Sequence, residues 1–225
     1  MNAGKSTGQI AHWPMNDNAA STVVADTGRN NLAGVFNDAG GDPNTDAHTV
    51  AGPTGQANTG LSFDGSDDFV ESNIQIVSGY PFTTSAWINT TSGAALEGIL
   101  ILADSSTGGV QYGISIASGK AIASSRNTTT RTATSTTDVD NGVWHHVVGV
   151  FTNDNLREIY VDGVWEANNT DAVTYAASVN RWSIGRYGDS SPDFYLTGSI
   201  SDVRVFSQAL TYPEIRKLYR AGGGQ

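Results

Sequence analysis

The chain has 225 residues, which is long enough to bury a sizeable hydrophobic core. Its formal net charge is -10, from 12 Lys plus Arg against 22 Asp plus Glu; this charge repels a phosphate backbone, so we expect no nucleic-acid partner. The absence of cysteine excludes a disulfide framework and thiol chemistry. No apolar run approaches the roughly 18 residues of a membrane span, so we expect no membrane insertion.

Short apolar runs recur between clusters of Gly, Asn, Asp, Ser and Thr, and helical periodicity is absent before the last segment of the chain. This spacing predicts an all-β protein with many strands joined by turns. All-β sandwiches of this size commonly form one domain, so we expect a single domain over residues 1–225, with a core over about 8–220.

The first predicted strand covers Gln9 to Met15, and Pro14 is typical of an edge or a strand end. Leu32 to Phe36 is a second short strand, and Asn37 to Thr59 is predicted as a long loop. The next predicted strands are Leu61 to Phe63, Phe69 to Glu71, Phe82 to Asn89, Glu97 to Ala103, Val110 to Ile116 and Lys120 to Ser124. The Thr-rich segment Ser125 to Thr137 is typical of an exposed or edge strand.

The segment from Asn141 to Gly163 predicts a β-hairpin. Alternation from Trp144 to Phe151 places largely apolar side chains on both faces, as expected for a strand inside a two-layer sandwich. The second strand, Leu156 to Val161, ends at Asp162-Gly163, a dipeptide favoured in tight turns. The pattern continues through Val164 to Asn168 as a third strand.

Two further strands are predicted near the C-terminus, Arg181 to Tyr187 and Phe194 to Phe206. The sequence Thr211-Tyr-Pro-Glu214 then predicts the start of a helix, because Thr and Glu at this spacing form a capping box and Pro fits the first turn. The helix side chains expected to face the sandwich are Ile215, Leu218 and Tyr219.

Three motifs in this chain resemble those of one family. Trp-His-His-Val at 144–147, followed by Ile-Tyr-Val-Asp-Gly at 159–163, resembles two paired strands of the laminin G-like, concanavalin A-like jelly-roll domains. Leu61 to Val70 resembles the family's early strand-turn-strand, and Gly198 to Tyr219 resembles its C-terminal strand and helix. The resemblance implies a two-sheet antiparallel β-sandwich, a concanavalin A-like jelly roll, with a short C-terminal helix.

The resemblance also implies a structural calcium ion. In the family, an Asp-x-x-Gly-x-Asn stretch often supplies ligands together with an Asp of the C-terminal strand. Those ligands carry over to Asp26, a carbonyl near Gly28, Asn31 and Asp202. Carboxylate, amide and carbonyl oxygens are the ligands that Ca²⁺ selects. The alternative is that Asp26 only caps a turn.

Glycosidases and polysaccharide lyases use the same fold, so catalysis has to be judged from individual residues. The five Glu residues do not fit the Glu-x-Asp-x-x-Glu pattern of one glycosidase branch, and the segment beginning at Gln111 matches the lyase strand poorly. His145 and His146 project to opposite faces of a strand and cannot easily hold one metal ion. We expect no enzyme activity, with a glycosidase or lyase as the second alternative.

A non-catalytic binding module fits the sequence better. Sugars are held by aromatic faces and a few planar polar groups. The predicted ligand-binding residues are Trp165, Trp182, Tyr187, Tyr195, Arg181 and Arg186, with Tyr112, Asn127 and Asp189 as further candidates. For each aromatic residue the alternative is packing in the core, to which we assign Trp87 and Trp144 outright.

We therefore expect a lectin-like module whose partner is a glycan. The alternative is a protein-interaction or structural adhesion module whose loops contact a surface protein. Met1 to Gln9 lacks the basic and apolar segments of a signal peptide. We accordingly expect the chain to act as part of a larger extracellular or cell-surface protein.

Overall fold

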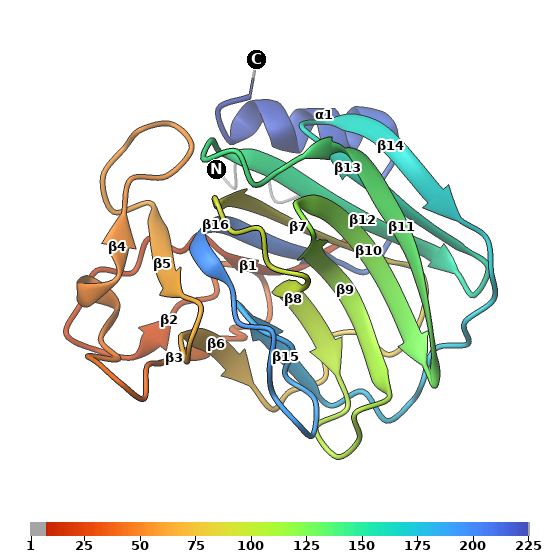
Figure 1. Ribbon diagram of the computed structural model, residues 1–225, viewed down its shortest axis with the longest axis horizontal. Helices are drawn as coiled ribbons and strands as arrows, with labels where there is room; N and C mark the ends of the chain where they lie inside the picture. The colour runs from red at the N-terminus through yellow and green to blue at the C-terminus, as the bar shows by residue number, and fades with distance from the viewer. Residues whose placement is uncertain (1–7, 225) are drawn as a thin grey trace.

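The computed structural model describes residues 8–224, in which two antiparallel sheets of eight strands each are packed face to face (Figure 1). The first sheet has the order β14-β13-β12-β7-β16-β5-β4, and β1 also pairs with β16. Its strands are β1 (Gln9–Trp13), β4 (Thr49–Val50), β5 (Gly60–Asp64), β7 (Phe82–Asn89), β12 (His145–Asn153), β13 (Leu156–Val161), β14 (Val164–Asn169) and β16 (Thr197–Phe206).

The second sheet has the order β11-β10-β9-β8-β15-β6-β3-β2. Its strands are β2 (Val23–Val24), β3 (Gly34–Asn37), β6 (Phe69–Ser72), β8 (Glu97–Ala103), β9 (Val110–Ala117), β10 (Lys120–Asn127), β11 (Thr129–Asp138) and β15 (Arg181–Ile184). Two helical segments complete the fold, the 3-10 turn η1 (Thr45–Ala47) and helix α1 (Tyr212–Ala221). The predicted all-β sandwich with a C-terminal helix is confirmed.

The main core lies between the sheets, because alternate residues of each strand point inward. Trp13 of β1 and Trp182 of β15 meet across the two layers, with ring centroids 4.2 Å apart. Phe82 of β7 stacks on Phe151 of the neighbouring β12 at 4.5 Å. Burying a side chain such as Phe stabilises the fold by about 1.5–3 kcal/mol.

The predicted hairpin is confirmed and continues as the meander β12-β13-β14. Asp162 and Gly163 form the turn between β13 and β14, with φ of 51° and 73°, a conformation that favours Gly and tolerates Asp. The Asp162 carboxylate accepts a hydrogen bond from the backbone N–H of His146 at 2.9 Å and lies 2.7 Å from Nδ1 of His145. The carboxylate therefore ties the turn to the start of β12.

The edge strands β11 and β14 belong to different sheets but lie side by side (Figure 1). The carboxylate of Glu166 on β14 accepts hydrogen bonds from the backbone N–H of Thr136 at 2.9 Å and from the hydroxyl of Thr137 at 2.7 Å. The prediction that the Thr-rich segment 125–137 forms an edge is confirmed for residues 129–137, which lie in β11, whereas residues 125–127 belong to the neighbouring strand β10. The contact covers two strand edges that are otherwise open to pairing with other chains.

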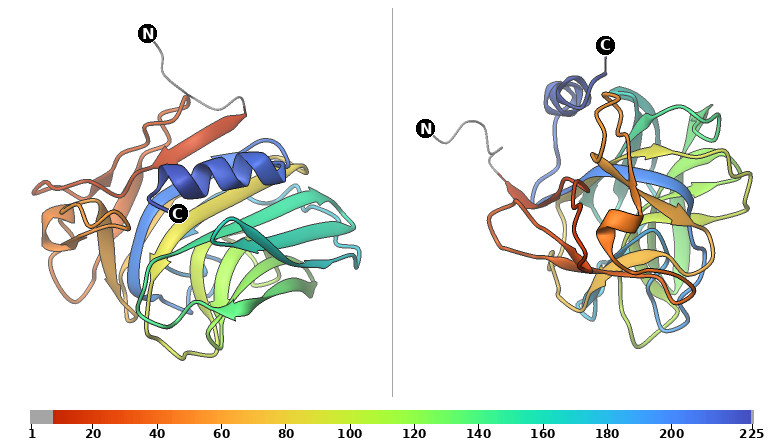
Figure 2. Two further views of the ribbon diagram at one scale, coloured as in Figure 1. Left: turned by 90° about the horizontal axis from the view of Figure 1, so that it is seen from above. Right: turned by 90° about the vertical axis from the view of Figure 1, so that its left-hand side faces the viewer.

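Helix α1 covers the outer face of the first sheet (Figure 2). Ile215 is fully buried in a second, smaller core on this face, and Tyr219 stacks on Trp87 with ring centroids 5.5 Å apart. The helix begins as predicted, because the Glu214 carboxylate accepts a hydrogen bond from the backbone N–H of Thr211 at 2.8 Å and completes a capping box.

The segment predicted as a long loop, Asn37 to Thr59, contains η1 and β4. The hydroxyl of Thr45 is buried and donates to the backbone carbonyl of Ala19 at 3.2 Å, which anchors this segment to a distant part of the chain. Elements of two or three residues are too short for a periodic pattern to reveal. No helix among the described residues is long and apolar enough to cross a membrane.

Candidate functional site

Two exposed aromatic side chains lie on the outer face of the first sheet, on two elements that contact each other. Trp165 follows the Asp162-Gly163 turn and pairs with Tyr160 of β13, so its indole lies on the face that carries helix α1. Tyr212 opens helix α1, which contacts β14 (Figure 1). Trp165 is 47% exposed and Tyr212 is 45% exposed. Together with Glu158 and Arg216 they form what we call the aromatic surface.

Glu158 and Tyr160 support the aromatic surface from β13. The indole Nε1 of Trp165 donates a hydrogen bond to the Glu158 carboxylate at 3.0 Å, which fixes the orientation of the ring. Burial, with the charge of Glu158 and the nearby Tyr212 as further causes, raises the pKa of Tyr160 to about 12. Tyr160 therefore stays neutral at neutral pH, with both Glu158 and Tyr212 close enough to affect its hydroxyl.

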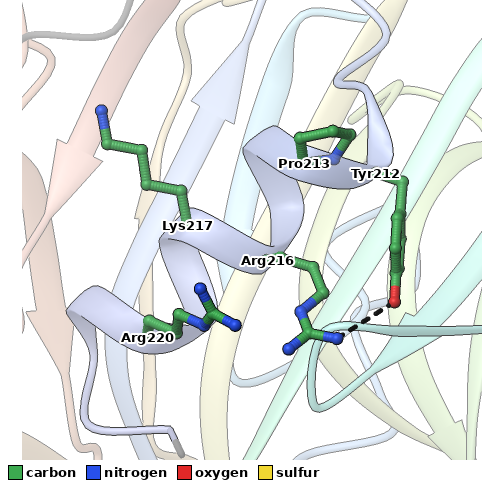
Figure 3. Close-up of a pocket in the computed structure, with 5 residues that line it drawn as sticks. All are labelled: Tyr212, Pro213, Arg216, Lys217 and Arg220. Carbon is green, nitrogen blue, oxygen red and sulfur yellow. Dashed lines mark hydrogen bonds between the residues drawn. The ribbon is translucent and has the colours of Figure 1, made fainter.

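Arg216 completes the aromatic surface from the helix. Its guanidinium donates a hydrogen bond to the Tyr212 hydroxyl at 3.2 Å, and its Cζ lies 5.9 Å from the centroid of that ring. Figure 3 shows the open hollow of about 450 Å³ along the helix, which is lined by Tyr212, Pro213, Arg216, Lys217 and Arg220. Exposed aromatic rings beside a carboxylate and a guanidinium are the groups that hold polar rings such as sugars.

Three of the six predicted ligand-binding residues meet on the outer face of the second sheet. The Arg186 guanidinium donates to the Glu71 carboxylate at 2.7 Å and to the Tyr195 hydroxyl at 3.3 Å, and it lies over the Phe69 ring at 3.3 Å. Nε of Arg181 lies 3.6 Å from the same Glu71 oxygen. Because these charged groups already bind other side chains of the same protein, the cluster has fewer free polar groups for a ligand than the aromatic surface has.

Trp182 and Tyr187, predicted as ligand platforms, belong instead to the interior. Trp182 is 0% exposed and packs on Trp13, and the buried Tyr187 has its hydroxyl 2.9 Å from that of Ser115. Tyr112 is also buried. The reason is the alternation along β15, which places Trp182 on the inner face, while the segment after β15 folds back over the second sheet. Rings in these positions have no face free for a ligand.

The remaining polar candidates also form hydrogen bonds within the protein. The Asn127 amide donates to the backbone carbonyl of Thr174 at 3.1 Å, and the buried Asp189 carboxylate accepts from Gln111. Trp87 is buried, as expected, whereas Trp144 is only half-buried. Of the predicted platforms, Trp165 alone keeps about half of its surface exposed in the described part of the chain.

Asp26, the first predicted calcium ligand, accepts hydrogen bonds from the backbone at both of its oxygens. Its Oδ1 accepts from the N–H groups of His12 at 2.8 Å and Gly28 at 2.6 Å, and its Oδ2 accepts from that of Leu32 at 2.8 Å. Asn31 is exposed within the same loop, with φ of 52°. This arrangement fits the alternative in which Asp26 caps a turn.

Asp202, the other predicted carboxylate ligand, is held by two side chains. Its Oδ1 lies 2.6 Å from Nε2 of His12 and accepts from the Arg204 guanidinium at 2.8 Å. Burial acts to raise the pKa of Asp202, but the hydrogen bonds and charges of His12 and Arg204 outweigh it and lower the pKa to about 2. Both carboxylates thus accept hydrogen bonds from N–H groups, and calcium at Asp26, Gly28, Asn31 and Asp202 stays a prediction.

A cluster of acidic residues and one histidine at the turn between β5 and β6 was not predicted from the sequence. Ligand atoms of Asp38, His48 and Asp68 lie within 4.8 Å of one another, and Asp64, Asp67 and Asp68 form a second such group. Burial raises the pKa of Asp68 to about 6, although the charge of His48 opposes the shift. The Asp-rich turn was visible in the sequence, but nothing in it placed His48 beside that turn.

Solved structures with this architecture come from several kinds of protein. Domain 4 of AbnA, a GH43 extracellular arabinanase from Geobacillus stearothermophilus in complex with arabinotriose, is 16% identical over 96% of this chain and 100% of that domain, with a TM-score of 0.69. The binding domain of botulinum neurotoxin serotype D is 13% identical over 95% of this chain, with a TM-score of 0.65. The Trypanosoma rangeli sialidase in complex with the inhibitor DANA is 17% identical over 96% of this chain, with a TM-score of 0.66.

The chain spans 52% of the toxin binding domain and 33% of the sialidase, and at these identities the likeness shows the fold alone. Family membership comes from a separate match. Residues 64–216 fit the model of the concanavalin A-like lectin/glucanases superfamily, which is more than half of the chain. The chain therefore belongs to the concanavalin A-like lectin/glucanases superfamily.

Proposed function

We propose that this chain is a non-catalytic carbohydrate-binding module that holds a glycan on the aromatic surface. The observation that carries the proposal is the exposure of Trp165 and Tyr212, 47% and 45%, on adjoining elements of one face. Leaving large aromatic rings in water sacrifices the free energy of burying them, and exposed rings of this kind serve as binding platforms.

The polar neighbours support the same role. The carboxylate of Glu158 accepts hydrogen bonds, as sugar hydroxyls require, and the guanidinium of Arg216 donates them. Both groups lie at the rings that would stack on the C–H faces of a sugar. The solved domain of the arabinanase was in complex with arabinotriose, so the architecture is compatible with an oligosaccharide ligand.

A role within a larger extracellular or cell-surface protein follows from this proposal. The related domain of known structure is one domain of an extracellular arabinanase, and the chain matches only part of the toxin and sialidase chains. A module of this kind keeps its parent protein at a polysaccharide or a glycosylated surface.

The proposal is tested by screening the chain on a broad glycan array and titrating the best oligosaccharide by calorimetry. Trp165→Ala and Tyr212→Ala are expected to weaken binding by about 10-fold or more each, since a stacked ring contributes on the order of 1–2 kcal/mol. Phe194→Ala is the matched control, because Phe194 is an exposed aromatic residue over the second sheet.

Loss of affinity in the first two variants with an unchanged Phe194→Ala supports the proposed site. If the folded protein binds no glycan on the array, the carbohydrate role is wrong. If Phe194→Ala alone weakens binding, the module binds a glycan through the second sheet and the assignment of the aromatic surface is wrong.

One feature favours the alternative role of contact with another protein. Val23 and Val35 pair across β2 and β3 at the edge of the second sheet, and both are about half exposed. An exposed apolar pair on a sheet edge suits a protein contact. A Val23→Ser, Val35→Ser double variant that no longer binds an intact parent protein or a cell surface, while it still binds glycan, would assign this edge to a protein partner.

A further inference from the structure

Helix α1 concentrates positive charge in an otherwise acidic protein. The chain has a formal net charge of -10, yet the helix carries Arg216, Lys217 and Arg220 against a single acid, Glu214. Glu214 is used within the capping box at the start of the helix. The outer face of the helix is therefore a local cationic patch.

The cations outside the helix are mostly neutralised by nearby carboxylates. Ion pairs join Lys120 to Asp138 at 2.6 Å and Arg131 to Asp171 at 3.2 Å, and similar pairs hold the arginines of β15 and β16. Among residues 8–224, no carboxylate lies within ion-pairing distance of the three helix cations. Their charge is thus available to an external anion.

The helix macrodipole does not account for this arrangement. A cation in the last turn, such as Arg220, is favoured by the dipole, but Arg216 and Lys217 lie further from the C-terminus, where that effect fades. Arg216 contacts the Tyr212 hydroxyl, which orients its guanidinium towards the aromatic surface. The cations are therefore continuous with the proposed binding surface.

Tyr212, Arg216 and Arg220 follow one another at intervals of four residues, so they form a stripe along one face of the helix. Figure 3 shows this stripe, with Lys217 extending from the side of the helix opposite Tyr212 and Arg216. Successive members of the stripe rise by about 6 Å along the helix axis. A row of guanidinium groups suits a chain that carries repeated carboxylates or sulfates.

We propose that the cations of helix α1 select an acidic polysaccharide, binding its carboxylate or sulfate groups while the aromatic surface stacks on its rings. The inference rests on the proposed carbohydrate role and adds the class of ligand. The charge of the rest of the protein repels polyanions in general, so binding requires contact at this patch.

The test compares three probes by calorimetry: oligogalacturonate, its carboxyl-reduced neutral counterpart, and a heparin-derived oligosaccharide. The inference predicts that at least one acidic probe binds more tightly than the neutral one, by about 10-fold, and that raising the ionic strength from about 0.01 M to about 1 M removes the difference. A Lys217→Gln, Arg220→Gln double variant is expected to lose most of that preference, since Gln keeps the helix propensity of Lys and Arg.

Arg126→Gln on β10 is the matched control and is expected to leave the preference unchanged. Equal affinity of the double variant and wild type for the acidic probes overturns the inference. If the neutral probe still binds in that case, the proposed carbohydrate role is retained. If no sugar binds to any variant, both proposals fail. Tight binding of single-stranded DNA that Trp165→Ala does not weaken shows a general polyanion surface and also overturns the inference.

Discussion

The indole of Trp165 remains exposed because its one polar group already has a partner at the surface. Its Nε1 donates to Glu158, and the ring lies on the outer face of the first sheet, where it is about half exposed. Trp182 has the opposite surroundings, since it lies on the inner face of β15 and packs against Trp13. Removing the two side chains should therefore lower the free energy of unfolding by different amounts.

We predict that Trp182→Ala destabilises the protein by about 3–5 kcal/mol, because it opens a large cavity between the sheets. Trp165→Ala is expected to change the free energy of unfolding by less than about 1 kcal/mol, because its ring is half in water. Urea unfolding of both variants checks this. Equal losses of stability would contradict the assignment of Trp165 to the surface.

The pH dependence of the protein's stability should show the effect of the raised pKa of Asp68. The pKa of Asp68 in the folded protein is about 6, above the ordinary value of 3.8. The protonated carboxyl group therefore contributes fully to the free energy of unfolding below pH 3.8, and this contribution is lost as the pH rises through 6. Asp68→Asn, which cannot ionise, is expected to be more stable than wild type at pH 8 by about 1–2 kcal/mol. The advantage should shrink at pH 4, as measured by urea unfolding at the two pH values.

A wild type at least as stable as Asp68→Asn at pH 8 would contradict this prediction. It would show that neighbouring groups compensate the buried carboxylate, and the nearest imidazole is that of His48, whose Nδ1 lies 3.8 Å from the Asp68 carboxylate. His48→Gln measured at the same two pH values separates that contribution from the burial of Asp68 itself.

Sequence patterns located part of the candidate site. Trp165 is among the aromatic residues predicted as platforms, but Trp182 and Tyr187 are predicted on the same ground and are buried. Alternation shows that neighbouring residues face opposite ways, yet it does not show which face is covered. Tyr212 and Arg216 were not predicted, because the helical pattern identifies only the apolar face that packs on the sandwich.

At the scale of elements, the loop after β1 is shaped by Asp26. Three backbone N–H groups donate to its carboxylate within 3 Å, and the one from His12 joins the loop to β1. We predict that a chelator leaves the midpoint of thermal unfolding unchanged, whereas Asp26→Ala lowers stability by about 1–3 kcal/mol through loss of these bonds. A lower midpoint in the chelator, restored by added calcium, would support the calcium site instead.

The strands and the helix were predictable to different degrees. The meander β12-β13-β14 and helix α1 carry local signals, an Asp-Gly turn and a capping box, and both formed where expected. The short elements η1 and β4 carry no such signal, because they are held by distant contacts such as the Thr45 hydroxyl on Ala19. The closure between β11 and β14 depends on Glu166, whose partners lie about thirty residues away in the sequence.

At the scale of the whole molecule, the outer faces of the two sheets differ in charge and cover. The first sheet carries helix α1 (Figure 2), and with it the aromatic surface and the three helix cations. The second sheet carries the cluster in which Glu71 pairs with Arg181 and Arg186. In the role that we propose, the cations of helix α1 orient an approaching anionic chain toward this face of an otherwise acidic protein.

The proposed binding site is tested most directly by an NMR titration of the five tryptophan indole N–H signals with the oligosaccharide that binds best on the array. The Trp165 signal is expected to shift on binding, because its Nε1 lies in the aromatic surface beside Glu158, while those of the buried Trp13, Trp87 and Trp182 stay in place. A bound ligand that leaves the Trp165 signal unmoved would contradict the proposed site and place binding elsewhere on the sandwich.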